Sequence, residues 1–382
     1  MSKKVRLALI TTTPLQIDFF LRPHISRWRE WSTVTVYTNI NAEKQLSQLN
    51  DDVIVQHFPI VRPIRLAHDC WAFCRLLGLL LLNRPDAVIT AAPKAGLVGS
   101  LAAWLLRIPF RCHIFQGEVW ANKTGLLRRI LILSDKVIAM LSTDVLVISE
   151  SEKKHLLEHQ VLSKTKGTVL GCGSISGVNL AQFTPDQTKR IESRSTLSIP
   201  LDKPVLGYMG RFSTEKGILE LAASFATLRA EGLECYLLLV GPDEENLAAT
   251  VLQYAAPYQD YVRFYPRTVT PENYLNAMDI LCLPSHREGF GNVIVEAAAC
   301  GVPAVASRIY GITDALLDRK TGLLHEVRNI EDLTQQLRLM LQNTEYRHSL
   351  GAAAQERVRT HFSQATVIER YNDYFKSKSQ SS

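Results

Sequence analysis

Two glutamates eight positions apart, Glu288 and Glu296, frame a segment whose composition suits an anionic, hydroxyl-rich ligand. The segment reads EGFGNVIVEAAACGVP over residues 288–303. Gly289 and Gly291 let the backbone approach a ligand closely, and the free N–H groups at the start of a helix favour anions and hydroxyl oxygens. Nearly every other side chain of the helix that follows is apolar, so Glu296 should be a buried carboxylate that needs a partner. The alternative is a surface glutamate on a short amphipathic helix, and the apolar surroundings favour the ligand-facing role.

A second segment places two cations where a diphosphate would be held. Residues 207–221 read GYMGRFSTEKGILEL, so Arg211 and Lys216 follow a run typical of a β-strand, and a helix begins near Gly217. Fixed cations at a strand end and helix start suit a diphosphate. Basic residues in such loops are commonly only solvated, but the nearby Glu288 loop strengthens the prediction of phosphate binding.

Several motifs that would imply other chemistry are missing from the sequence. There is no P-loop pattern, and no two aspartates stand two positions apart, so the D-x-D pair that often holds a divalent metal is absent. The run 170–179 resembles a dinucleotide fingerprint but has the wrong spacing, and it should form a tight turn. The histidines are dispersed along the chain and stay unassigned. We therefore expect no cofactor and a reaction that does not need a metal.

Length and composition indicate two domains. The chain has 382 residues, of which 46% are hydrophobic and 21% are charged. Its seven cysteines form neither a disulfide framework nor paired metal spacing, so reduced thiols in the cytoplasm are expected. The first residues fit a strand better than a signal peptide, and the apolar stretch 70–82, interrupted by Arg75, should be too short to span a bilayer.

Charge is distributed unevenly along the chain. Residues 1–185 carry 22 Lys and Arg against 13 Asp and Glu, whereas the remainder carries 21 against 24. A basic half suits nucleic acid, an anionic membrane or a phosphorylated substrate, and it holds no recognisable nucleic-acid motif. The stretches 65–84 and 126–141 combine apolar and basic residues and could lie at a membrane surface. Core helices of an α/β domain are the more common alternative.

Short β-rich runs alternate with helical stretches in two successive series. The first series comprises residues 5–10, 34–38, 53–58, 87–91, 111–115 and 145–149, and the second comprises 205–209, 236–240, 262–265, 280–284, 304–307 and 323–325. This alternation predicts two doubly wound α/β domains, whose ligands would bind in the cleft between them. The polar run 184–204 is the expected linker. The predicted domain limits are 1–185, 186–355 and a terminal helical segment 356–382.

These motifs resemble a known family. Similarity to the donor half of the family 4 retaining glycosyltransferases is carried by residues 209–218, 236–242, 279–307 and 311–324. Similarity to the branch that makes bacterial capsule and O-antigen is carried by residues 20–25, 93–103 and 171–183. The resemblance implies the GT-B fold: an acceptor-side and a donor-binding Rossmann-like domain facing across a cleft, with the last helix returning to the first domain.

The resemblance also implies a role for each candidate residue. Arg211 and Lys216 would neutralise the donor diphosphate as it leaves. Glu288 would contact the donor sugar and stabilise positive charge that develops at its anomeric carbon, whereas Glu296 would hold the ribose. The backbone of the glycine loop would bind the donor sugar, through Gly289, Phe290, Gly291 and Asn292.

On the acceptor side the sequence departs from the family pattern. Residues 11–16 read TTTPLQ, without the glycine-rich turn that often follows the first strand, and Gln116 stands before Gly117 where many members have a histidine. The acceptor-side contacts implied by the resemblance are Gln116 and Lys94.

The function that the resemblance implies is transfer of a hexose or N-acetylhexosamine from a nucleotide diphosphate, expected to be UDP, to a polyprenyl-diphosphate-linked saccharide. The product would be a bacterial surface polysaccharide such as O-antigen, capsule or exopolysaccharide. The enzyme would work at the inner face of the cell membrane as a peripheral protein. Two alternatives remain open: a UDP-sugar 2-epimerase of the same architecture, and a non-catalytic regulator that binds sugar nucleotides.

Overall fold

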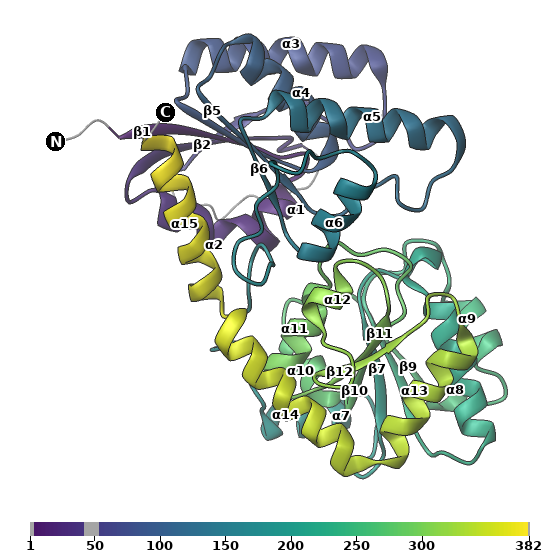
Figure 1. Ribbon diagram of the computed structural model, residues 1–382. Coiled ribbons are helices and arrows are strands. Elements are labelled where there is room, and N and C mark those ends of the chain that lie inside the picture. The colour runs from purple at the N-terminus through teal and green to yellow at the C-terminus, as the bar shows by residue number, and fades with distance from the viewer. Residues whose placement is uncertain (1–3, 42–52, 381–382) are drawn as a thin grey trace. The chain divides into compact units, whose positions relative to one another are not determined.

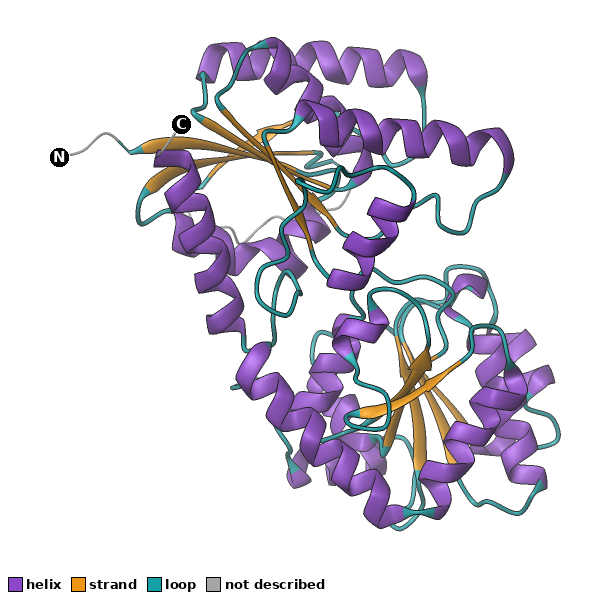
Figure 2. Ribbon diagram, in the orientation of Figure 1, coloured by secondary structure: helices purple, strands orange, loops and turns teal. Residues whose placement is uncertain are grey.

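The computed structural model describes residues 4–41 and 53–380, and it contains two compact units (Figures 1 and 2). Unit 1 is formed by residues 1–176 and 365–382, and unit 2 by residues 177–364. Each unit is built around one parallel sheet of six strands with helices on both faces. The sequence-based prediction of two doubly wound α/β domains is therefore confirmed.

The sheet of unit 1 has the strand order β3-β2-β1-β4-β5-β6. Its strands are β1 Val5–Ile10, β2 Ser32–Thr38, β3 Ile54–His57, β4 Ala87–Ala91, β5 Phe110–Phe115 and β6 Asp144–Val147. Its helices are α1 Pro14–Gln16, α2 Arg22–Trp28, α3 Leu66–Asn83, α4 Pro93–Leu105, α5 Gly125–Leu141, α6 Glu150–Glu158 and α15 Gln364–Gln380, with a π-helical turn at Ile17–Leu21. Helices α3, α4 and α5 lie along one face of the sheet, and α2 and α15 lie against the other (Figure 1).

The sheet of unit 2 repeats this arrangement in the order β12-β11-β10-β7-β8-β9. Its strands are β7 Val205–Met209, β8 Tyr236–Val240, β9 Val262–Tyr265, β10 Ile280–Leu283, β11 Ala304–Ser307 and β12 Gly322–His325. Its α-helices are α7 Gln187–Thr196, α8 Ile218–Ala230, α9 Ala248–Tyr254, α10 Pro271–Ala277, α11 Asn292–Ala299, α12 Ile312–Ala315, α13 Ile330–Gln342 and α14 Thr344–His361. Short 3-10 turns lie at η2 Thr214–Lys216 and η3 Gln259–Tyr261.

Every strand expected from the sequence is present, within one or two residues at each end. The reason is that a parallel sheet covered on both faces needs nearly continuous apolar runs. In β1 the four residues from Leu7 to Ile10 are all buried, and β10 is buried along its whole length. Such runs are short, rich in branched residues and bounded by turns, so they are visible in the sequence.

The polar run 184–204, expected to be a linker, instead contains α7 and belongs to unit 2. Asp186 caps the helix by accepting hydrogen bonds from Thr188 N and Lys189 N. The guanidinium of Arg194 is buried, donates to Asp279 Oδ2 over 2.6 Å and donates to four backbone carbonyls. The polar composition of the run therefore reflects a helix whose charged side chains satisfy buried backbone groups.

The last helix packs within unit 1, so the expected return of the chain to the first domain is confirmed. On α15, Phe375 contacts Trp28 with ring centroids 5.2 Å apart, and it contacts Phe110 at 6.2 Å. Tyr371 donates its hydroxyl to the carbonyl of Ser174 over 3.2 Å. A break at residues 362–363 separates α14 from α15.

Helix α3 is longer and more exposed than the sequence-based prediction allowed. It has 18 residues with a mean hydropathy of 1.2, and by length and composition it could cross a membrane. Only 22% of it is buried. Its inner face, with Ala72, Leu76 and Leu80, contributes to the core of unit 1. The prediction that this stretch is too short to span a bilayer is therefore wrong on length, and α3 packs on the sheet as an amphipathic helix.

Candidate functional site

The topology of unit 2 creates a binding crevice beside its central strands. Strands β7 and β10 are neighbours. After β7 the chain continues into α8, which packs with α13, whereas after β10 it continues into α11, which packs with α14 on the other face (Figure 1). Ligands of such sheets bind where the connections diverge, at the carboxyl ends of the strands. The loops 210–217 and 284–291 lie at this position.

These two loops are in direct contact. Gly217 has φ 68°, and a Cβ atom at this position would lie 2.1 Å from the carbonyl oxygen of Pro284. Only glycine therefore fits here. The amide of His286 donates to the carbonyl of Glu215 over 2.9 Å, and Arg287 Nε lies 2.9 Å from Glu215 Oε1. The turn after β7 consequently fixes the loop that carries Glu288.

The structure brings two of the sequence-predicted residues together as an ion pair. Lys216 Nζ lies 2.6 Å from Glu288 Oε1, and each side chain is 16% exposed. A pair this close in a partly dehydrated site is a strong charge-assisted hydrogen bond. The cation predicted for the diphosphate and the carboxylate predicted for the sugar are thus partners of each other.

Arg211 lies in the same region but has a different partner. Its guanidinium pairs with Glu244 Oε2 over 2.6 Å, and both side chains are about half exposed. The buried hydroxyl of Tyr208 donates to the carbonyl of Arg211 over 2.7 Å. Burial raises the pKa of Tyr208, the charge of Glu288 raises it further and the charge of Arg211 lowers it. The charges of Glu288 and Arg211 are therefore both close enough to Tyr208 to shift its pKa.

Helix α11 presents two polar groups without partners. Glu296 is half-buried, and within residues 4–41 and 53–380 its carboxyl group makes no hydrogen bond or ion pair. Burial raises its pKa to about 7. Asn292 Oδ1 is also buried without a hydrogen-bond partner. Because residues four apart share one face of a helix, these two groups could contact a single ligand.

The glycine loop itself is held from a third direction. Gly311 has φ 81°, and a Cβ atom there would lie 2.4 Å from the carbonyl oxygen of Gly289. Gly291 also has a positive φ, 72°, immediately before α11. The Phe290 side chain is 2% exposed and packs against Phe362, with ring centroids 5.4 Å apart. Phe290 can therefore offer a ligand only its backbone.

In unit 1, the acceptor-side candidates differ in how they are satisfied. Lys94 Nζ lies 2.8 Å from Asp69 Oδ1 and donates to the carbonyl of Pro63 over 2.6 Å, so its charge is already paired. Gln116 follows β5, and among the residues that the structure describes its buried Nε2 has no hydrogen-bond partner. Of the two, Gln116 is the one whose polar group is left for a ligand.

A buried carboxyl cluster beside Gln116 was not predicted from the sequence. Glu152 accepts hydrogen bonds from the amides of Gly117 and Ile148, and the buried Glu118 lies within electrostatic reach of its carboxyl. Burial and the charge of Glu118 raise the pKa of Glu152 well above its usual range. Trp120 donates its indole N–H to Asp135 over 2.7 Å. These contacts fix the turn that carries Gln116.

Two family models match this chain. The model described as glycosyl transferases group 1 matches residues 189–357, and the one described as glycosyl transferase 4-like domain matches residues 27–173. The first match includes every candidate residue in unit 2.

Individual relatives agree with these matches. The capsular polysaccharide biosynthesis glycosyltransferase CapM of Staphylococcus aureus is 30% identical over 338 residues, which cover 87% of this chain and 88% of that protein. An N,N'-diacetylbacillosaminyl-diphospho-undecaprenol alpha-1,3-N-acetylgalactosaminyltransferase of Campylobacter jejuni is 26% identical and covers 86% of each chain.

Solved structures show the same fold. Sucrose-phosphate synthase from Thermosynechococcus elongatus has a TM-score of 0.82 at 20% identity, covering 99% of this chain and 100% of that one. Anabaena HepE in complex with UDP and glucose has a TM-score of 0.81 at 17% identity, covering 98% and 100%. With the family matches and the CapM relative, the conclusion is that this chain belongs to the family 4 glycosyltransferases, has the GT-B fold and is a glycosyltransferase.

Proposed function

We propose that this protein is a retaining, metal-independent glycosyltransferase that moves a hexose or N-acetylhexosamine from a UDP-sugar to a polyprenyl-diphosphate-linked saccharide. The product would be a bacterial surface polysaccharide, namely capsule, O-antigen or exopolysaccharide. The observation that carries this proposal is the contact between Lys216 and Glu288. It lies after the neighbouring strands β7 and β10, whose following helices go to opposite faces of the sheet, and Glu296 lies on α11, the helix that begins just after Glu288.

The proposed donor contacts follow from the charges of the site. The diphosphate would attract Lys216 away from Glu288, which leaves that carboxylate free to face the donor sugar. Arg211 would join Lys216, because its exposed pair with Glu244 is weak enough to exchange for a phosphate. Glu296 would accept hydrogen bonds from the ribose hydroxyls. The positive charge that neutralises the departing diphosphate would thus come from side chains, without a metal.

The choice of donor and acceptor is supported by the named relatives. HepE has been solved with UDP, with UDP and glucose, and with UDP-glucose. The Campylobacter relative is named for transfer to a diphospho-undecaprenol-linked sugar, and the Staphylococcus relative for capsular polysaccharide biosynthesis. An acceptor of this kind has an anionic diphosphate and a lipid tail, which suits the basic first half of the chain.

Incubation with a panel of UDP-sugars and a polyprenyl-diphosphate-linked saccharide tests the proposal. We expect transfer of one sugar with retention of the anomeric configuration, unchanged by EDTA, with the product identified by mass spectrometry and NMR. Interconversion of UDP-N-acetylglucosamine with its 2-epimer, without transfer, would favour the epimerase alternative. Donor binding without transfer or hydrolysis would favour the regulator.

The surface of unit 1 supports a peripheral location at the inner face of the cell membrane. Large apolar side chains are exposed on three helices, namely Leu66, Trp71, Leu81 and Leu82 of α3, Trp104 and Leu105 of α4, and Leu126, Leu127, Ile130, Leu133 and Met140 of α5. The three helices lie on one face of the sheet (Figure 1). Exposed basic residues accompany them, including Lys123 and Arg129. Apolar and basic side chains on one face are typical of helices that lie on an anionic bilayer.

Vesicle binding tests this location. The protein should bind anionic vesicles at low salt and release at 1 M salt, because the Debye length falls from about 8 Å at 0.15 M to about 3 Å. Lys123→Glu with Arg129→Glu should weaken binding in a sedimentation assay. Arg319→Glu with Lys320→Glu, an exposed basic pair in unit 2, is the matched control and should bind like wild type. Equal binding to neutral and anionic vesicles would contradict the electrostatic account.

A further inference from the structure

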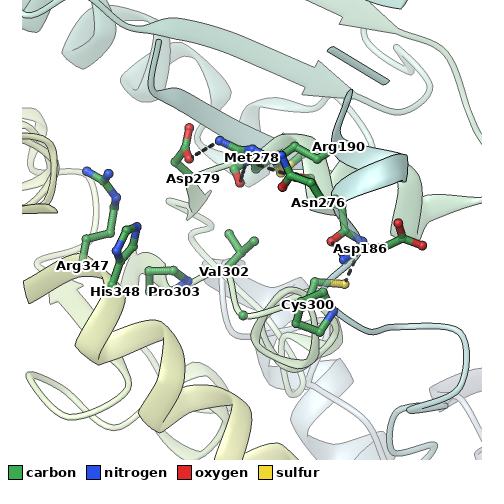
Figure 3. Close-up of a pocket in the computed structure, with 13 residues that line it drawn as sticks. Asp186, Arg190, Asn276, Met278, Asp279, Cys300, Val302, Pro303, Arg347 and His348 are labelled. Carbon is green, nitrogen blue, oxygen red and sulfur yellow. Dashed lines mark hydrogen bonds and ion pairs between the residues drawn. The ribbon is translucent and has the colours of Figure 1, made fainter. Parts of the chain in front are cut away.

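Unit 2 contains a cavity at the amino-terminal ends of its strands, whereas the candidate donor site lies at their carboxyl-terminal ends. The cavity has a volume of about 470 Å³ (Figure 3). Asp279, immediately before β10, and Pro303, immediately before β11, both line it. These positions are at the amino-terminal ends of the strands, whereas the loops with Lys216 and Glu288 follow the carboxyl ends. The cavity is therefore separate from the donor site.

Four segments form the walls of this cavity. The start of α7 contributes Asp186 and Arg190, the turn after α11 contributes Cys300, and α14 contributes Arg347 and His348, while the segment between α10 and β10 that holds Asp279 closes the fourth side (Figure 3). The volume lies within the range of small-molecule sites, about 300 to 1,000 Å³.

Both acidic residues of the cavity are already engaged. Asp279 Oδ1 pairs with Arg190 over 2.7 Å, and its Oδ2 accepts from Arg194 over 2.6 Å and from the amide of Val205 over 2.7 Å. Asp186 caps the amino terminus of α7. Asp279 thus already pairs with two guanidinium groups, and in the described part of the chain neither carboxylate forms an ion pair with Arg347.

Arg347 is a cation that lines the cavity and has no carboxylate partner among the described residues. Its side chain is buried, with the residue only 6% exposed, and in the described part of the chain no carboxylate lies within 4.0 Å of it. It donates to the carbonyl of Met340 over 2.8 Å and to Thr344 Oγ1 over 3.4 Å, which leaves most of its five N–H donors unused. Burial and the charge of Arg190 lower its pKa, while the charge of Asp279 opposes this.

A buried guanidinium without a counterion is costly unless an anion reaches it. Arg347 lines an open hollow, so an anion from solution has access. The exposed side chain of His348 lies beside it on α14 (Figure 3). The planar guanidinium matches the oxygens of a phosphate group, and the hollow leaves room for a carbon body as well.

We propose that this cavity is a second ligand site, which binds a small phosphorylated molecule through Arg347 and His348. The phosphate lies against the guanidinium of Arg347. The carbon body occupies the remaining space towards Cys300, where Met278, Val302 and Pro303 provide apolar surface. The site binds its ligand independently of the nucleotide-sugar donor, because the two sites lie at opposite ends of the strands.

Calorimetric titration with glycerol 3-phosphate and with inorganic phosphate tests this site, in protein saturated with UDP so that the donor site is occupied. Wild type should bind both saturably, with glycerol 3-phosphate tighter. Arg347→Gln should weaken binding at least about tenfold, the loss of one charge-assisted contact. His348→Glu, at an exposed position that tolerates substitution, should also weaken it through charge repulsion.

Arg359→Gln is the matched control, because Arg359 lies on the same helix with an exposed side chain and outside the cavity. It should bind both probes like wild type. The proposal is overturned if wild type shows no saturable binding, if UDP displaces the phosphates, or if His348→Glu binds as tightly as wild type. A folding defect in Arg347→Gln leaves His348→Glu to decide.

Discussion

Glu288→Gln is expected to lower kcat by about a hundredfold or more while leaving the Kd for UDP unchanged or smaller. The effect on kcat follows because a carboxylate that faces developing positive charge acts mainly in the transition state, and loss of one such group costs roughly 10² to 10³ in rate. UDP binding should not suffer, because Glu288 holds Lys216 at 2.6 Å in the donor-free protein and the amide releases that cation. Steady-state kinetics and isothermal titration with UDP measure the two effects.

Glu296→Gln is the matched comparison, since it makes the same chemical change on α11, the helix that follows the Glu288 loop. A contact to ribose is made equally in the ground state and the transition state, so its loss should raise Kd and KM with little change in kcat. If Glu288→Gln abolishes UDP binding, or if Glu296→Gln leaves both Kd and KM untouched, the assignment of the two glutamates is wrong.

The pH dependence of UDP binding provides a further check on Glu296. Burial raises the pKa of this carboxyl to about 7, so it is largely protonated at pH 6 and largely ionised at pH 8. The carboxylate is the form that accepts hydrogen bonds from two ribose hydroxyls. The ratio of the UDP affinities of wild type and Glu296→Gln should therefore rise between pH 6 and pH 8, and dividing by the variant removes titration of the nucleotide itself. A constant ratio would contradict the ribose contact.

The strands and the two loop segments of the candidate site were predictable because their signals are local. A buried parallel strand is a short apolar run, and a doubly wound sheet places its functional loops directly after such runs. Arg211, Lys216 and Glu288 all follow β7 or β10 within a few residues, so sequence position alone indicated which edge of the sheet they occupy. The pairing of Lys216 with Glu288 was not visible, because the contact joins residues 72 positions apart.

The features that sequence analysis missed depend on contacts between distant residues. The polar composition of residues 184–204 predicts a linker, yet Arg194 of α7 lies buried against carbonyls and Asp279, 85 residues away. Glu118 and Glu152 look like ordinary surface glutamates until the fold buries both beside Gly117. Arg347 likewise gives no signal along α14, since only the packing of α7 and the turn after α11 creates the hollow beside it. Polar residues in cores are specified by tertiary partners, not by periodicity.

Lys216→Ala is expected to weaken UDP binding by about ten- to a hundredfold and to lower kcat/KM at least as much. A charge-assisted contact to the diphosphate is worth about 1.5 to 3 kcal/mol. The structure adds a second cost, because removal of Lys216 leaves Glu288 without its partner at 2.6 Å and directs an uncompensated negative charge at the donor. Lys320→Ala, which removes an exposed cation from the same unit, is the control and should have no effect.

A double-mutant cycle separates these two costs. In the Glu288→Gln background position 288 carries no charge, so Lys216→Ala should lose only the diphosphate contact, and its effect on Kd for UDP should be smaller than in wild type. If the effect is the same in both backgrounds, Glu288 does not repel the bound diphosphate and the exchange of partners by Lys216 is refuted. If Lys216→Ala leaves UDP binding unchanged in wild type, the diphosphate assignment itself fails. Because the cycle compares variants at one pair of contacting side chains, it measures directly whether the ion pair of the donor-free protein is replaced when the nucleotide binds.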